Sequence, residues 1–276
     1  AAKAARRLTP RDRCVIIGAG GLGHIGIQVL NSGAGMLNFG NTTSNTSGGA
    51  GVNLASNAGA VSFADLDIAP DANATAFSSS NNTGVTSSST GTISTTDAPA
   101  VTVTNSALNM TLTSVSADNT GDADSCVSLT TTTGTLNMQS GTLIGGTGAA
   151  FLVSGGNATV TYSGSITQNS AARVIDIQGP TGNTVSFNTG TITGGASSLG
   201  VHIGDTTAVN GNVSFANLNL GTVGARMTNQ AVTITNGTGT YSLGAVSIFT
   251  NNVSGLVATN ADGTLNSTSG AVDSSN

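Results

Sequence analysis

The sequence predicts an all-β fold, a parallel β-helix (β-solenoid) of about nine coils of roughly 25 residues, with a short N-terminal helix-strand-helix cap. Three observations lead to this prediction. Apolar residues alternate with Ser, Thr or Asn in short runs. These runs recur at a regular spacing, and Gly, Asn, Ser and Pro fill the gaps between them. We therefore expect two segments, a cap in residues 1–32 and a repeat domain in residues 33–276.

The composition separates an ordered repeat protein from a disordered chain. Charged residues make up 7% of the sequence, Glu and Trp are absent, and Gly, Ser, Thr and Asn dominate. Disordered chains usually combine a high net charge with low hydrophobicity. Here 37% of the residues are hydrophobic and the mean hydropathy is +0.15. We therefore expect an ordered all-β structure.

The N-terminal segment holds most of the basic residues, which are Lys3, Arg6, Arg7, Arg11 and Arg13. Its pattern predicts a helix, a turn at Thr9-Pro10, a buried strand over residues 14–17 and a second helix over residues 22–30. We interpret the basic residues as a solvated helix face rather than an interaction tail. Residues 1–10 lack the apolar core of a signal peptide and there is no initiator Met, so we expect a fragment, a processed form or a fusion.

A glycine motif follows the predicted strand, with the order G-x-G-x-x-G at Gly18, Gly20 and Gly23. The stretch over residues 15–26 resembles the cofactor domain of zinc-dependent, medium-chain alcohol dehydrogenases, and this resemblance implies that the three glycines hold a dinucleotide. An acidic residue about 20 positions later is needed for the ribose, but residues 31–64 contain no Asp or Glu. We therefore expect no NAD binding and interpret the segment as a cap over the open end of the solenoid.

The repeat appears as a first apolar run in each coil. These runs lie at residues 52–54, 76–77, 101–103, 127–129, 151–153, 174–177, 201–203, near Met227 or Val232, and at 256–257. From Val52 to Leu256 the chain advances 204 residues in eight steps, a mean of 25.5. A second run often follows, as at 61–63 and 185–187, and then a third, as at 66–68. Three strands per repeat predict a triangular coil.

Such coils must stack in parallel, because one coil cannot bury its own apolar face. Gly and Asn can supply the positive φ angles of the corners, and stacked Asn or Thr side chains can form ladders. An antiparallel β-sandwich also has short strands at regular spacing. The 25-residue recurrence favours the solenoid.

Three acidic residues in one turn, Asp118, Asp122 and Asp124, are a candidate calcium site, since Ca²⁺ prefers oxygen ligands. Their order fits neither an EF-hand nor a glycine-rich nonapeptide repeat, so a solvated turn is the preferred interpretation. A second acidic pair, Asp65 and Asp67, is expected on one face of a strand. Paired carboxylates cleave polysaccharides in glycosidases, and Arg173 would have to join them in one groove for such a role.

Two further patterns have simpler explanations. Thr-Gly-Thr or Ser-Gly-Ser triplets occur at residues 90–92, 133–135, 163–165 and 189–191, and a flat threonine ladder could bind ice, but Thr also simply suits strand exteriors. His202 alternates with two apolar residues and is expected to face solvent or bond to a turn, and Asp205 is expected at a corner.

The repeat domain resembles bacterial secreted or surface-exposed right-handed β-helix proteins, in phrases such as Gly51-Val52-Asn53-Leu54, Gly190-Thr191-Ile192-Thr193-Gly194-Gly195 and Ala172-Arg173-Val174-Ile175-Asp176-Ile177. The resemblance implies an extracellular or cell-surface rod for adhesion or display, without catalysis. The alternatives are a carbohydrate-active β-helix and a non-functional alcohol dehydrogenase-like fragment fused to a β-helix.

The expected partners follow from the charge distribution. Residues 14–276 carry two Arg against eleven Asp, about −9, which argues against nucleic acid or an anionic membrane. Glycans or a neighbouring cell surface are the expected partners. We expect no cofactor, no membrane span and no catalytic residues.

Overall fold

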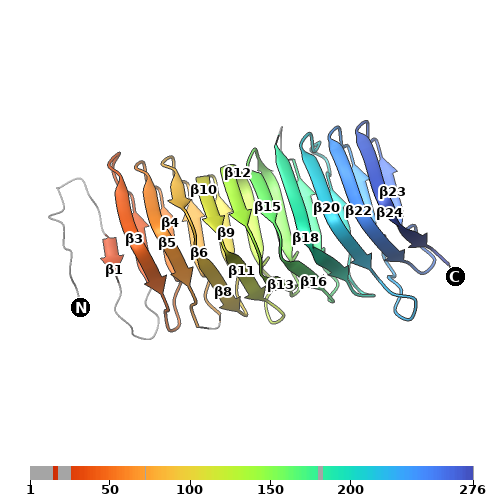
Figure 1. Ribbon diagram of the computed structural model, residues 1–276, viewed down its shortest axis with the longest axis horizontal. Helices are drawn as coiled ribbons and strands as arrows, with labels where there is room; N and C mark the ends of the chain where they lie inside the picture. Colours follow the sequence, from red (N-terminus) through yellow and green to blue (C-terminus); the bar gives the residue numbers. More distant parts are fainter. Residues whose placement is uncertain (1–14, 18–25, 72, 180–182, 276) are drawn as a thin grey trace.

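The computed structural model of the protein describes residues 15–17, 26–71, 73–179 and 183–275. These residues contain strands and turns but no helix. They form a parallel β-solenoid of the right-handed type with about ten turns, whose coils follow one another along a single axis (Figure 1). The predicted fold class is confirmed.

Each coil contributes to three parallel sheets. The first sheet contains β2 (Ile27–Leu30), β4 (Val52–Ala55), β6 (Phe77–Ser80), β9 (Val101–Thr104), the start of β12 (Val127–Met138), β14 (Phe151–Gly156), β17 (Ile175–Gln178), β19 (Val201–Ile203), β21 (Val232–Thr235) and β23 (Leu256–Thr259). Its strands begin where the sequence places the first apolar run of each coil. Of the two alternatives near residue 230, Val232 is the one that starts a strand.

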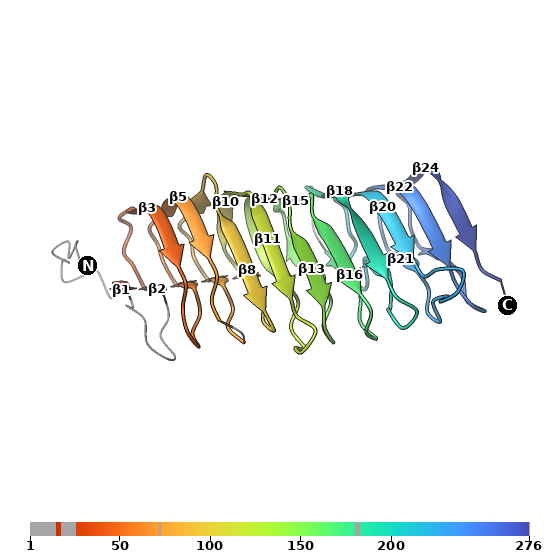
Figure 2. The same cartoon turned by 60° about the horizontal axis from the view of Figure 1, so that its bottom comes forward.

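Long strands pass through both the second and the third sheet in six coils: β3 (Leu37–Ser44), β5 (Val61–Ile68), β18 (Thr184–Gly194), β20 (Asn212–Leu220), β22 (Thr240–Phe249) and β24 (Thr264–Asp273). In the other coils the second sheet takes β7 (Thr86–Ser88), β10 (Ala107–Leu112), the end of β12 and β15 (Thr159–Tyr162). The third sheet takes β8 (Thr92–Thr96), β11 (Ser114–Asp118), β13 (Thr142–Gly145) and β16 (Ser165–Gln168), which follow one another along the rod in Figure 2.

The core is a set of stacked columns inside the rod. The parallel register places Val52 beside Phe77, Phe77 beside Val101 and Val101 beside Val127, all of them fully buried. Alternation turns every second residue of each strand inward and the others outward. The inner apolar columns and the outer polar surface therefore come directly from the repeat.

The corners use left-handed backbone, as the sequence predicts. At the end of the first-sheet strand, one residue in every described coil has a positive φ: Asn31, Ser56, Asn81, Asn105, Thr131, Gly155, Gly179, Gly204, Asn236 and Asn260. Asn and Gly adopt this conformation at the lowest energy. Next to this corner, the side chains of Asn57 and Asn82 form a buried ladder, in which the backbone N–H of Asn57 donates to Asn82 Oδ1 over 2.8 Å. The predicted ladder is confirmed here.

The predicted N-terminal cap needs one correction. The helix expected over residues 22–30 is wrong for its described part, because Ile27–Leu30 is the strand β2 and pairs in parallel with β4. Ile27 and Val29 lie on the inner columns of Val52 and Leu54. Stacking on the next coil therefore makes this segment a strand, although the glycine motif before it had suggested a helix. The strand expected over residues 14–17 is present as β1 (Val15–Ile17), which pairs antiparallel with β2. The coil of β2 and β3 raises the number of coils from the nine expected to about ten.

Candidate functional site

The outer face of the first sheet carries the features that suggest a binding site. Its outward side chains form two rows along the rod, one residue of each row per coil. The first row runs through Ser78, Thr102, Ser128, Leu152, Asp176, His202 and Thr233. The second row runs through Ser80, Thr104, Thr130, Ser154 and Gln178. We call these two rows the first-sheet face.

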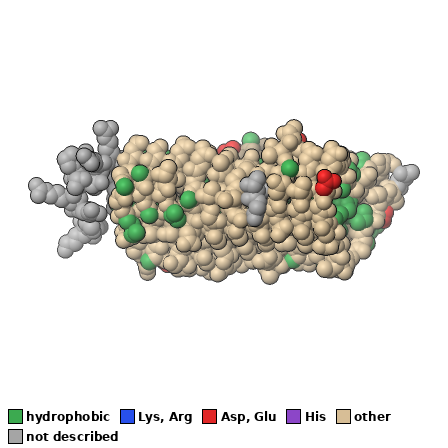
Figure 3. Space-filling view, turned by 90° about the horizontal axis from the view of Figure 1, so that it is seen from above, with side chains coloured by type: hydrophobic (Ala, Val, Ile, Leu, Met, Phe, Trp, Pro, Cys, Tyr) green, Lys and Arg blue, Asp and Glu red, His purple; other side chains and the backbone are tan. Residues whose placement is uncertain are grey.

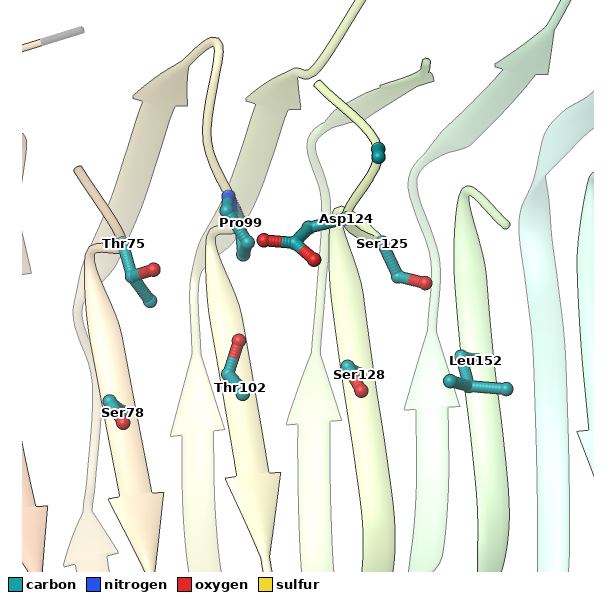
Figure 4. A pocket seen from close by; sticks show the side chains of 9 residues that line it. Thr75, Ser78, Pro99, Thr102, Asp124, Ser125, Ser128 and Leu152 are labelled. Carbon is teal, nitrogen blue, oxygen red and sulfur yellow. The ribbon is translucent and has the colours of Figure 1, made fainter. Parts of the chain in front are cut away.

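A depression of about 320 Å³ lies at the start of these strands. Figure 4 shows Ser78, Thr102 and Ser128 side by side on three neighbouring strands, with Asp124 in the loop before β12 and its carboxylate directed toward Pro99. Pro99 and Leu152 add apolar surface. The volume lies at the lower end of the roughly 300–1,000 Å³ that ligand sites occupy. The site therefore offers hydroxyl groups, one carboxylate and a small apolar patch.

The loop beside this depression is held by a hydrogen bond from Asn119. Asn119 is fully buried, and its side-chain Nδ2 donates to the carbonyl of Asp124. Asp118 Oδ1 accepts from the hydroxyl of Thr120 over 2.9 Å, and Asp122 Oδ1 accepts from the N–H of Ala123 over 2.6 Å. Two of the three predicted calcium ligands thus bond to their own turn.

In the described part of the chain, no three His, Cys, Asp or Glu side chains come together to hold a metal ion. Asp118, Asp122 and Asp124 therefore share a loop without converging on one point. The solvated-turn interpretation fits this arrangement.

A second depression, of about 220 Å³, lies at the opposite edge of the first-sheet face, where its strands end. It is lined by Thr130 and Ser154 of the second row, by Gln178, and by Asp205 and Thr207 from the loop after β19. Asp205 follows Gly204, whose φ is +79°, so the corner predicted for Asp205 is confirmed. This depression also presents hydroxyls, an amide and one carboxylate.

A hydrogen-bonded pair, Asp176 and His202, continues the first row beyond the first depression. His202 Nδ1 lies 2.9 Å from Asp176 Oδ1, and the amide of Gln178 donates to Asp176 Oδ2 over 3.0 Å. The side chains of His202 and Asp176 are only 15% and 17% exposed. Sequence reasoning placed His202 on the outside but did not find this pair. The signal was available, since Asp176 and His202 occupy the same position in successive repeats.

Arg173 belongs to the same charged group. Its Nη1 donates to the carbonyl of Leu199 over 2.6 Å. Burial lowers the pKa of its guanidinium, and the charges of Asp176 and Asp205 counteract that shift. Arg173 thus stays a cation that lies near the carboxylates of Asp176 and Asp205, while His202 is hydrogen-bonded to Asp176.

The grouping of Asp65, Asp67 and Arg173 that the carbohydrate-active alternative would require is not assembled. Asp65 and Asp67 do share the outer side of β5, in the third sheet, but Arg173 precedes β17 in the first sheet, several coils away. Asp67 Oδ1 instead accepts from the N–H and the hydroxyl of Thr92, at 2.9 and 2.6 Å. Asp67 therefore joins two coils.

The Thr-Gly-Thr triplets do not form one ladder. Gly91 and Gly164 lie between strands of the second and third sheets, and Gly190 lies inside the long strand β18. Gly134 lies within β12 and stacks on Leu108 of the second sheet. A Cβ at Gly190 would lie 1.8 Å from the carbonyl oxygen of Gly164, so at this corner the glycine permits close stacking. The flat surface that the ice-binding hypothesis requires is not formed by these triplets.

The dinucleotide glycines Gly18, Gly20 and Gly23 lie outside the described residues. In the part of the chain that is described, no helix has the length and apolar character needed to cross a membrane. Comparison with protein-family models, with curated proteins and with solved structures gives no match to this chain.

Proposed function

We propose that the protein is a non-catalytic interaction module, an extracellular or cell-surface rod that binds neutral glycans on its first-sheet face. The observation that carries this proposal is the row Ser78, Thr102 and Ser128 beside Asp124, with Leu152 at its end (Figure 4). Neighbouring strands are about 4.8 Å apart, so the hydroxyls recur at a spacing close to the length of one sugar residue.

The surface charge supports a neutral ligand. Figure 3 shows one side of the molecule, where uncharged polar groups and backbone make up most of the surface, with scattered hydrophobic side chains and few carboxylates. Hydroxyls and a carboxylate can exchange hydrogen bonds with sugar hydroxyls, and the carboxylates of Asp124, Asp176 and Asp205 beside the first-sheet face outnumber the single guanidinium of Arg173, which disfavours an acidic polymer. The resemblance of the repeat to bacterial surface β-helix proteins supports the extracellular location.

The test is binding of the full chain to immobilised β-glucan, β-mannan, xylan and polygalacturonate, followed by analysis of the products. We expect retention on at least one neutral polymer, weaker retention on polygalacturonate, and no release of reducing or unsaturated ends. Failure to bind any of the three neutral polymers would overturn the proposal. Release of new chain ends would replace it with the carbohydrate-active alternative.

The variant Ser128→Ile fills the depression and removes a hydroxyl, so it should weaken retention. Ser242→Ile is the matched control, because Ser242 also faces outward but belongs to the second sheet, in the penultimate coil of the rod. Equal loss in both variants would show that the first-sheet face is not the site.

A further inference from the structure

We infer that the two depressions are the ends of one diagonal groove, which holds a single linear, neutral polysaccharide across six strands of the first sheet. This inference rests on the proposed function and adds the shape and path of the ligand. The inferred ligand is a polymer rather than a small sugar, because a ligand bound in one depression would leave the surface between the two depressions uncovered.

The two depressions share two strands. On β12, Ser128 lines the first depression and Thr130 lines the second. On β14, Leu152 lines the first depression and Ser154 lines the second. Residues i and i+2 of a strand point to the same side and are about 7 Å apart. The two depressions therefore meet over β12 and β14 on one continuous surface.

The path along the rod follows from the strand order. The first depression begins at β6 and the second ends after β19, with β9, β12, β14 and β17 between them. Five spacings between stacked strands give about 24 Å along the axis. Because the path also crosses the strands from one end to the other, its total length is about 30 Å. Several sugar residues of an extended chain would fill it.

Carboxylates mark both ends of this groove. Asp124 lines its first end and Asp205 its second. Arg173, which borders it, donates to the carbonyl of Leu199, and His202 is hydrogen-bonded to the carboxylate of Asp176. The three carboxylates of Asp124, Asp176 and Asp205 outnumber the one guanidinium and would repel a polyanion, whereas a neutral chain can donate hydroxyl hydrogen bonds to them. The charges therefore favour a neutral polymer.

The experiment measures the affinity of the full chain for linear β-glucan and β-mannan oligosaccharides of two to eight hexoses by calorimetry. In the class that binds, we expect the affinity to rise with length until the ligand spans the groove and then to level off, as for linked binding contacts. Ser154→Ile should lower the affinity for the longest oligosaccharide about tenfold and leave that for the shortest within about twofold. Ser128→Ile should weaken both, and Ser242→Ile neither.

The outcomes separate this inference from the proposed function. If the longest oligosaccharide binds no more tightly than the shortest, or if Ser154→Ile leaves its affinity unchanged, the single groove is refuted while glycan binding at the first depression stands. If no oligosaccharide of either class binds and none of the three neutral polymers retains the chain, the proposed function itself fails. Circular dichroism of each variant confirms that the fold is retained before binding is compared.

Discussion

Two coils of this rod have the same backbone arrangement but differ in the side chains that they bury. The coil of β14, β15 and β16 buries the side chains of Phe151, Val153, Val160, Tyr162 and Ile166. The coil of β6, β7 and β8 buries Phe77 and Ile93, but also Ser79, Asn82, Thr86 and Ser88. Both coils pair in parallel with the coils on either side. We call them the aromatic coil and the hydroxyl coil.

The difference shows that the ladder of backbone hydrogen bonds fixes the fold, while the interior can be filled in two ways. In the aromatic coil, Phe151 packs edge-on against Phe187 with ring centroids 5.2 Å apart. In the hydroxyl coil, polar side chains bond to the backbone instead, as where Ser88 Oγ donates to the carbonyl of Thr90 over 2.7 Å. A buried polar group is tolerated when it has such a partner. The two interiors should therefore respond differently to substitution.

The largest effect is expected in the aromatic coil. Phe151→Ala removes a fully buried ring and leaves a cavity beside Phe187 and Tyr162, so the free energy of unfolding should fall by about 3–5 kcal/mol. Urea denaturation measures the loss, and hydrogen exchange should locate it in the central coils. Leu152→Ala, on the outer side of the same strand, is the control and should change stability much less. Similar losses would mean that the central coils are not tightly packed.

Alkaline pH should weaken the central coils next. Burial raises the pKa of the Cys126 thiol from its usual 9.0 to about 12, and burial likewise raises the pKa of the Tyr162 hydroxyl. Above pH 9 the unfolded chain loses the thiol proton while the folded protein keeps it. The contribution of the protonated thiol to the free energy of unfolding is complete below pH 9. It is lost as the pH rises towards 12, at up to about 1.4 kcal/mol per pH unit for each such group.

The measurement is urea denaturation at pH 8 and pH 10.5 for the natural chain and for Cys126→Ala. The difference between the two pH values should be smaller in the variant, because only the thiol of Cys126 has been removed. An unchanged difference would show that Cys126 ionises as readily in the folded protein as in the unfolded chain.

In the hydroxyl coil the sensitive residue is Asn82. Its Nδ2 donates to the carbonyl of Leu54 over 3.0 Å, and its Oδ1 accepts from the N–H of Asn57. Asn82→Ala leaves both backbone groups buried without their partner, which should lower the free energy of unfolding by about 1–3 kcal/mol. Asn109→Ala, on the exposed side of β10, should have little effect in the same denaturation experiment. Equal stability of the two variants would contradict a role for the buried ladder.

The same contrast explains which features could be predicted from sequence. The aromatic coil alternates apolar and polar residues in Val160-Thr161-Tyr162, so its strands and columns were predicted. The hydroxyl coil has Phe77-Ser78-Ser79-Ser80, in which inner and outer positions are chemically alike, and only its first strand was recognised. Period-two alternation carries information only where the two faces differ.

The candidate site was harder to predict than the core for a related reason. Asp124 and Ser128 are close in sequence, but Ser78, Thr102 and Ser128 are joined only by the register of stacked coils. Asp176 and His202 likewise meet because one coil separates them. A single residue inserted into one repeat would move these contacts, so the site depends on the exact coil lengths, which vary along the chain.

The smallest effect tests whether the polar interior is required or merely tolerated. Ser79 lies on an inner column between Leu54 and Val103, and its hydroxyl accepts a hydrogen bond from Asn82 Nδ2 over 2.9 Å. Because Asn82 Nδ2 also bonds to Leu54, Ser79→Val should leave the ladder intact and add buried apolar area. The free energy of unfolding should rise by about 1 kcal/mol, whereas the outward variant Ser80→Val should change it by less than about 0.5 kcal/mol. A loss of stability in Ser79→Val would show that the Ser79 hydroxyl is needed to hold Asn82 in place, and that the hydroxyl coil is a linked polar network rather than an apolar coil with substitutions.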